Sequence, residues 1–125
     1  MVKSIRETAV SFGVTPRTLR YYEEIGLLTP GRSSGNQRVY ASQDAARLKL
    51  ILRGKKYGFS LEEIREMILL FDEDRSGRKQ LERSIEYGEK RIREIETVIS
   101  EFQLLKEEME GWLMHFEQKL KEEES

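Results

Sequence analysis

Residues 15–28 read TPRTLRYYEEIGLL, and this stretch carries signals for both ends of one short helix. Thr15 is a favourable N-cap, and Pro16 is tolerated at the first helical position, where an N–H has no intrahelical partner. The glycine before the final two leucines ends the helix. Leu19 and Tyr22 lie three apart and face a core, so both arginines, Thr18 and the first tyrosine point elsewhere. The stretch predicts a helix that presents cations and hydroxyls to a partner.

The residues before this stretch predict another short helix. Ser4 and Glu7 form a capping-box pattern, which opens a helix from about residue 5 to 11. That helix ends near Gly13. Two short helices joined by a glycine-containing turn are typical of a helix-turn-helix.

A small wing is expected next. Residues 29–37, TPGRSSGNQ, are rich in Pro, Gly, Ser and Asn and predict a loop. The following residues, 38–40, read RVY and predict a short strand. Its expected partner is the segment around Leu27 to Thr29, which would make a hairpin.

Two more helices complete the expected head. One starts at Ser42 and runs to about Tyr57, with Leu48 and Ile51 on its apolar face. The other opens at a second capping box, Ser60 to Glu63, and runs to about residue 71.

The last third of the chain has a heptad pattern. With Leu81 at position d, ten of the twelve a and d positions from 81 to 120 are apolar, and Gly88 and Lys106 are the exceptions. A helix over these residues would be about 60 Å long at about 1.5 Å per residue, too long to bury its stripe on a head of this size. The pattern predicts pairing with a second copy through Leu81, Ile85, Ile92, Ile95, Ile99, Phe102, Met109, Leu113 and Phe116.

Two features near the end of the chain have alternative interpretations. Gly111 is a candidate break, after which a separate short C-terminal helix would follow. Trp112, His115 and Phe116 either form an aromatic ligand pocket or pack the coiled coil, and the second interpretation is favoured. Glutamates at the e positions lean slightly towards a parallel coil without deciding its orientation.

Charge and composition narrow the function. Residues 1–59 carry 11 Lys or Arg against 4 Asp or Glu, whereas the acidic remainder brings the chain to a net charge of −1. A basic first half indicates a polyanion-binding module.

Residues for catalysis or metal binding are scarce. Cysteine is absent and there is one histidine, and we find no nucleophile–base pair, phosphate loop or metal cluster. We therefore expect no enzyme, no cofactor and no metal. Without a signal peptide or a membrane-spanning run, we expect a cytoplasmic protein.

The candidate DNA contacts lie on the second helix and in the wing. Arg17 and Arg20 can bind phosphate or a guanine edge, and Thr18 and Tyr21 can donate to phosphate oxygens. Three wing side chains can lie along a phosphate backbone: Arg32, Arg38 and Tyr40. The alternatives are a solvated helix face and an ordinary charged hairpin. Lys55 and Lys56 are further candidates, but the helix dipole alone favours basic residues at a helix C-terminus.

Three segments resemble the MerR family of bacterial transcription regulators. They are TLRYYEEIGLL at 18–28, NQRVYASQD at 36–44 and YGFSLEEIREMI at 57–68. Their order and spacing match, and the heptad helix follows where that family has its dimerisation helix. The resemblance is close over residues 3–70. The remaining residues resemble the family only in the general character of a heptad helix.

The resemblance implies a mainly α fold. A winged helix-turn-helix DNA-binding domain would occupy 1–71, and a dimerisation helix forming an antiparallel coiled coil would occupy 76–125. It implies a homodimer that binds double-stranded DNA at a pseudo-palindromic promoter site and distorts it so that RNA polymerase can engage the promoter. By motif, the DNA contacts would be Arg17, Thr18, Arg20, Tyr21, Arg38, Tyr40 and Lys56.

The sequence departs from the metal- and redox-sensing members of that family, which use cysteines that this chain lacks. The effector is then an unidentified small molecule, or there is none. The sequence names neither the operator nor the regulated genes, and it does not distinguish an activator from a repressor. An architectural DNA-bending protein and a coiled-coil adaptor that docks an acidic protein are the alternative functions.

Overall fold

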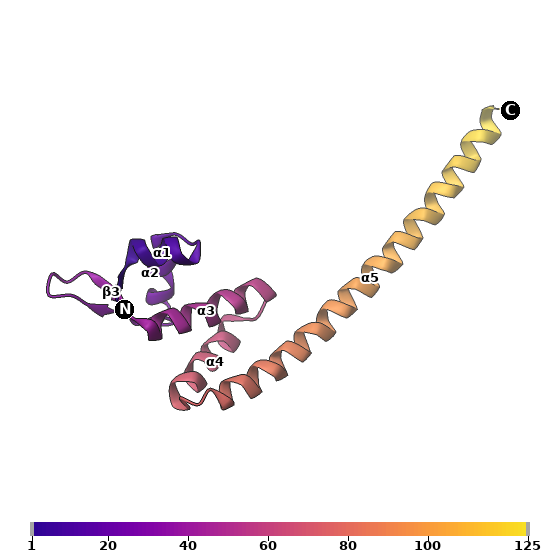
Figure 1. Cartoon of the computed structure of the whole chain (residues 1–125). Coiled ribbons are helices and arrows are strands. Elements are labelled where there is room, and N and C mark those ends of the chain that lie inside the picture. The colour runs from indigo at the N-terminus through magenta and orange to yellow at the C-terminus, as the bar shows by residue number, and fades with distance from the viewer. Residues whose placement is uncertain (1, 125) are drawn as a thin grey trace. The chain divides into compact units, whose positions relative to one another are not determined.

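The computed structural model describes residues 2–124, which form five helices and one small three-stranded sheet (Figure 1). In chain order the elements are β1 (Lys3–Ser4), α1 (Ile5–Phe12), α2 (Pro16–Glu24), β2 (Gly31–Arg32), β3 (Arg38–Tyr40), α3 (Ser42–Tyr57), α4 (Leu61–Glu73) and α5 (Arg78–Glu124). By internal contacts the chain divides into two compact units between Tyr87 and Gly88. The first unit therefore contains the early turns of α5.

The predicted helix starts are confirmed, and at α1, α2 and α4 local hydrogen bonds from the predicted capping residues make the cap. In α1 the Glu7 N–H donates to the Ser4 hydroxyl at 3.1 Å, and the Glu7 carboxylate accepts from the Ser4 N–H at 2.9 Å. Ser60 and Glu63 repeat this arrangement at the start of α4. At α2 the Thr15 hydroxyl accepts the Thr18 N–H at 3.1 Å.

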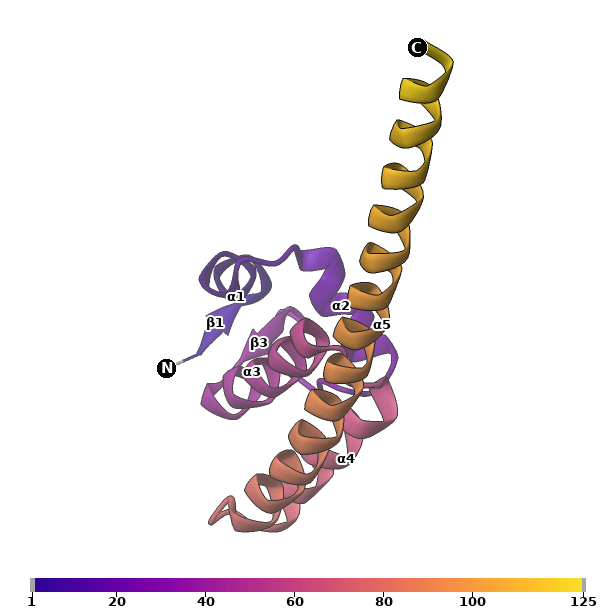
Figure 2. The ribbon, with the colours of Figure 1, turned by 90° about the vertical axis from the view of Figure 1, so that its right-hand side faces the viewer.

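The sheet differs from its prediction. Its strand order is β1-β3-β2, and both outer strands pair antiparallel with β3. Figure 2 shows β1 beside β3. The expected partner around Leu27 to Thr29 is wrong: β3 pairs instead with Gly31–Arg32 and with Lys3–Ser4. The N–H groups of Leu27 and Leu28 donate to the Tyr22 carbonyl at the end of α2, at 2.8 and 3.2 Å, and their side chains are buried. This segment therefore completes the end of α2 and fills the core.

One hydrophobic core joins the sheet and the first four helices. Its largest fully buried side chains come from α2, α3, α4 and the segment after α2. They are Leu19, Leu27, Leu28, Leu48, Ile51 and Ile64. The predicted inward positions Leu48 and Ile51 are confirmed, and Ile64, Met67 and Ile68 of α4 are buried with them.

A glycine allows α3 and α4 to pack closely. Gly54 is buried in α3, and a Cβ there would lie 2.6 Å from Cγ1 of Ile64, which is fully buried. A Cβ at this position would force α3 and α4 apart or displace Ile64, so the close contact requires a residue without a side chain.

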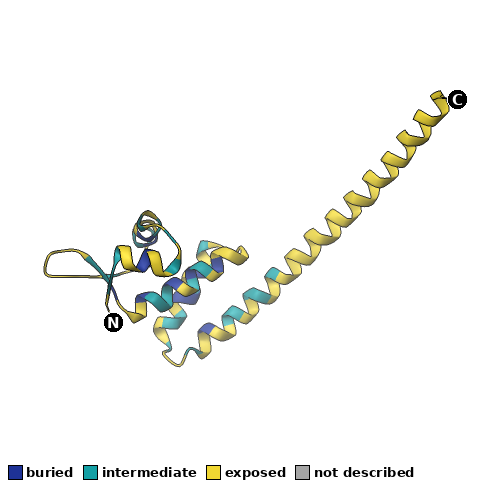
Figure 3. Cartoon of the chain, turned by 45° about the horizontal axis from the view of Figure 1, so that its top comes forward, coloured by how far each residue is buried: buried dark blue, intermediate teal, exposed yellow. Residues whose placement is uncertain are grey.

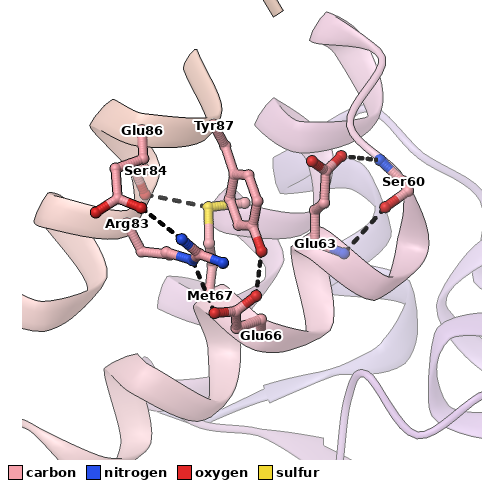
Figure 4. A network of polar contacts seen from close by, with 8 residues as sticks. All are labelled: Ser60, Glu63, Glu66, Met67, Arg83, Ser84, Glu86 and Tyr87. Carbon is pink, nitrogen blue, oxygen red and sulfur yellow. Dashed lines mark hydrogen bonds and ion pairs between the residues drawn. The ribbon is translucent and has the colours of Figure 1, made fainter. Parts of the chain in front are cut away.

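Polar contacts join α4 to the first turns of α5 (Figure 4). Arg83 donates to Glu66 at 2.8 Å, and the Tyr87 hydroxyl donates to the other oxygen of the same carboxylate. The Arg83 guanidinium also lies over the Tyr87 ring, 4.5 Å from its centroid. These hydrogen bonds, first from Tyr87 and then from Arg83, lower the pKa of Glu66. They fix the start of α5 on the head.

The separate helix expected after Gly111 does not form, because α5 is continuous from Arg78 to Glu124. One glycine costs a helix about 1 kcal/mol relative to alanine, and good helix formers surround this one. Beyond residue 91 every described residue of α5 is exposed (Figure 3). Among residues 2–124, no helix is long and apolar enough to cross a membrane.

Candidate nucleic-acid interface

Helix α2 separates its anchoring residues from its exposed ones. Leu19 and Tyr22 are buried in the core, whereas Arg17, Arg20 and Tyr21 are exposed, as the helical spacing predicts. The Tyr21 ring leans on the Tyr22 ring, with 6.0 Å between the centroids. The core therefore holds α2 in place while two guanidinium groups and a phenol stand on its outer face.

Thr18 is only half-exposed and serves the helix start. Its hydroxyl is 2.9 Å from the Thr15 hydroxyl, which also accepts the Thr18 N–H. A hydroxyl can donate once and accept twice, so Thr18 keeps capacity for a phosphate oxygen beside the cap.

The wing arginines share one carboxylate from α2. Arg32 of β2 and Arg38 of β3 are direct cross-strand partners. Each contacts a different oxygen of Glu23: Nη2 of Arg32 lies 3.2 Å from one, and Nε of Arg38 lies 2.5 Å from the other. The hydrogen bond to Glu23 raises the pKa of Arg38, so its guanidinium stays cationic beside α2.

The structure corrects the prediction for Tyr40. Its side chain is 3 % exposed and belongs to the core, so it does not face a phosphate backbone. Among the described residues, its hydroxyl has no hydrogen-bond partner. Burial, and then the nearby charge of Glu23, raise the pKa of Tyr40. Alternation along β3 places Arg38 and Tyr40 on one face, and that face packs inward at Tyr40.

Lys56 is exposed at the far end of α3, with its amino group 5.6 Å from the centroid of the Tyr57 ring. Helix α3 follows the wing directly, so Lys56 lies about 20 Å along the helix axis from the wing at about 1.5 Å per residue. The structure therefore brings α2 and the wing together and places Lys56 at a separate position.

A basic cleft beside the wing was not predicted. Arg6 from α1 lines it together with Arg32 and Arg38, and Ser4, Ile5, Asn36 and Gln37 complete the lining. Asn36 has a positive φ of 60°, and its N–H donates to the Ser33 carbonyl in the wing turn. The basic excess of the first half indicated such a surface, but only the fold shows that α1 contributes to it.

The nine predicted dimerisation residues are exposed in the single chain, from 41 % for Ile95 to 66 % for Phe102. Near the end of α5, the Trp112 and Phe116 rings are 6.1 Å apart, as are the His115 and Phe116 rings. These three residues line a shallow depression on one helix. In the part of the chain that the structure describes, no three acidic or histidine side chains gather as a metal site would require.

Comparison with known proteins decides the family. The family described as MerR HTH family regulatory protein matches residues 3–69, and a second, described as MerR, DNA binding, matches residues 45–112. The transcriptional regulator CueR of Salmonella typhi is 33 % identical over 108 residues, which cover 85 % of this chain and 75 % of CueR. The chain belongs to the MerR family.

Further relatives agree with this membership. The MerR-family regulator HmrR of Rhizobium leguminosarum bv. viciae is 39 % identical over 74 residues, which cover 58 % of this chain and 57 % of HmrR. A solved structure of HiNmlR, a MerR family regulator lacking the sensor domain and bound to promoter DNA, has a TM-score of 0.61 and 25 % identity. The match covers 82 % of this chain and 76 % of the HiNmlR chain. This MerR protein is thus a DNA-binding transcription regulator with a winged helix-turn-helix head, and its long α5 fits coiled-coil dimerisation.

Proposed function

We propose that the protein binds a pseudo-palindromic promoter site as a homodimer and regulates transcription by distorting the bound DNA. The observation that carries the proposal is the placement of Arg17, Arg20 and Tyr21 on the outer face of α2, with Arg32 and Arg38 attached to the same helix through Glu23. A helix with two exposed arginines suits base edges, and a basic wing suits the neighbouring phosphates.

The exposed stripe of α5 supports the homodimer. Nine large apolar side chains repeat at heptad spacing along a helix that is exposed in the single chain. A second copy of α5 covers such a stripe most simply, because the same a and d positions then interlock. Two heads on one coil would bind two half-sites, and we take the coil to be antiparallel, as the family resemblance implies.

Distortion of the DNA accounts for regulation without an enzymatic step. A protein that bends or untwists its site changes base pairs that it does not touch, and so changes how RNA polymerase meets the promoter. The effector is an unidentified small molecule, or there is none. Because the chain has no cysteine, a thiolate-bound metal ion is excluded as that effector.

Selection of DNA from a random library by the purified full chain, at low and at moderate salt, tests this proposal. We expect an inverted repeat whose affinity falls steeply with salt, since arginine contacts release counterions from phosphate. Salt-sensitive binding without any motif would instead indicate an architectural DNA-bending protein. Failure to bind DNA at all would indicate a protein partner for the basic head.

A further inference from the structure

We propose that Glu23 is a positioning residue for DNA recognition, which holds the wing against α2 so that both elements meet DNA in one register. The inference rests on the proposed function for its DNA readout and on the head alone for its geometry. Glu23 is in the last turn of α2, and its carboxylate contacts both strands of the wing.

Local effects alone do not explain a carboxylate at this position. The C-terminal end of a helix carries partial negative charge, which disfavours glutamate there. The same helix presents Arg17 and Arg20, so DNA phosphates that approach these residues would also repel Glu23. A favourable contact with another element must therefore offset these two unfavourable interactions of the Glu23 carboxylate.

The wing makes this favourable contact through two arginines. Arg32 and Arg38 face each other across β2 and β3, and like charges directly opposite destabilise a strand pair. Glu23 gives each guanidinium a separate oxygen, so it neutralises this repulsion and attaches both strands to α2. Its side chain is 24 % exposed, and that of Arg38 is 26 % exposed, so water screens this contact less than a surface pair.

The attachment leaves the arginines able to bind phosphate. A guanidinium has five N–H donors, and Glu23 accepts from only one nitrogen of each arginine. Arg38 contacts Glu23 through Nε, so both of its Nη groups remain available to a DNA phosphate. Bidentate contacts between a guanidinium and a phosphate are strong. Glu23 thereby fixes the direction of these donors relative to Arg17 and Arg20, without itself touching DNA.

Two substitutions at Glu23 separate position from charge. Glu23→Gln removes the charge, and Glu23→Asp keeps the charge but shortens the reach by one methylene. Glu24→Gln is the matched control, because Glu24 is the next residue of α2, is exposed and is absent from the wing contacts described. Binding is measured by fluorescence anisotropy on the selected duplex and on a scrambled duplex, with thermal unfolding to verify the fold.

We expect both Glu23 variants to bind the selected duplex about tenfold more weakly, the scale of losing a hydrogen bond to a charged group. The scrambled duplex should change far less, so the specificity ratio falls. Glu24→Gln should bind both duplexes as well as the wild type or slightly better, since it removes a charge that repels phosphate. Tighter binding of Glu23→Gln to both duplexes, or wild-type binding by Glu23→Asp, would overturn the proposal.

Hydrogen exchange in the free protein provides a test that does not need DNA. The Ser33 and Asn36 amides donate within the wing turn, and they should exchange faster in Glu23→Gln than in Glu24→Gln. Unchanged exchange in Glu23→Gln would overturn the positioning role even if the wild type selects no DNA motif. The absence of such a motif would by itself contradict only the proposed function.

Discussion

Gly54 shows how a single residue sets the packing of the head. A Cβ at this position would lie 2.6 Å from Cγ1 of Ile64, which is fully buried in the core. We expect Gly54→Ala to lower the free energy of unfolding by up to about 2 kcal/mol, because overpacking outweighs the gain in helix propensity. Thermal unfolding measures this change.

Gly111→Ala is the matched control for that substitution. Gly111 is also helical, but a Cβ there meets nothing within 4 Å. The same chemical change should therefore raise the helix content of α5 slightly. Equal destabilisation by the two substitutions would contradict the role assigned to the contact between α3 and α4.

Arg20 tests the outer face of α2. If Arg20 contacts a base edge, Arg20→Ala should weaken binding to the selected duplex by about 1–3 kcal/mol and relax specificity at one base pair. Arg93 is an exposed arginine of α5 that belongs to the second unit, so Arg93→Ala removes the same charge without changing the head and should leave the affinity nearly unchanged. An equal loss on selected and scrambled duplexes would reduce Arg20 to a phosphate contact.

At the scale of elements, local signals predicted the helices well. Capping residues such as Ser4 and Ser60 satisfy N–H groups only a few residues away, so the sequence contains the whole interaction. The winged helix-turn-helix fold followed from the order of these helices and from the family resemblance.

Contacts between distant segments escaped prediction. The β3 partner was missed because Leu27 and Leu28 serve the core and the end of α2. Tyr40 was expected on the wing surface, yet it is buried against helices whose positions a three-residue strand does not reveal. The link from Glu23 to both wing strands spans 9 and 15 residues of sequence, and no local pattern indicates it.

The junction between α4 and α5 gives a prediction about pH. The folded-state pKa of Glu66 lies below its ordinary value, because Tyr87 and Arg83 donate to the ionised carboxylate. A lowered pKa stabilises the fold above the unfolded-state value of about 4.3, and this contribution is lost as the pH falls through the folded-state pKa. We expect Glu66→Gln to be less stable than the wild type at neutral pH and to converge with it in acid.

Acid titrations followed by circular dichroism test this prediction. Glu89→Gln is the control, since Glu89 is exposed on α5 and takes no part in the junction contacts. A stability difference for Glu66→Gln that stays constant down to acid pH would assign the effect to packing rather than to the ionised carboxylate.

For the whole molecule, the absence of cysteine allows the orientation of the coil to be tested directly. In an antiparallel coil with full overlap of the heptads, Ile92 of one chain faces Met109 of the other. A chain carrying both Ile92→Cys and Met109→Cys should form intermolecular disulfides on mild oxidation, whereas Ile92→Cys alone should not. Cross-linking by the single variant would show a parallel coil, in which the two Ile92 positions meet.

The central claim is that two copies of this chain act together on one DNA site. Native mass spectrometry of the purified protein with the selected duplex tests it most directly. We predict two chains on each full inverted repeat, and loss of that complex when Ile92 and Ile99, both exposed on α5, are replaced by aspartate. A stable complex of one chain with the full site, or a two-chain complex that survives both aspartates, would contradict the claim.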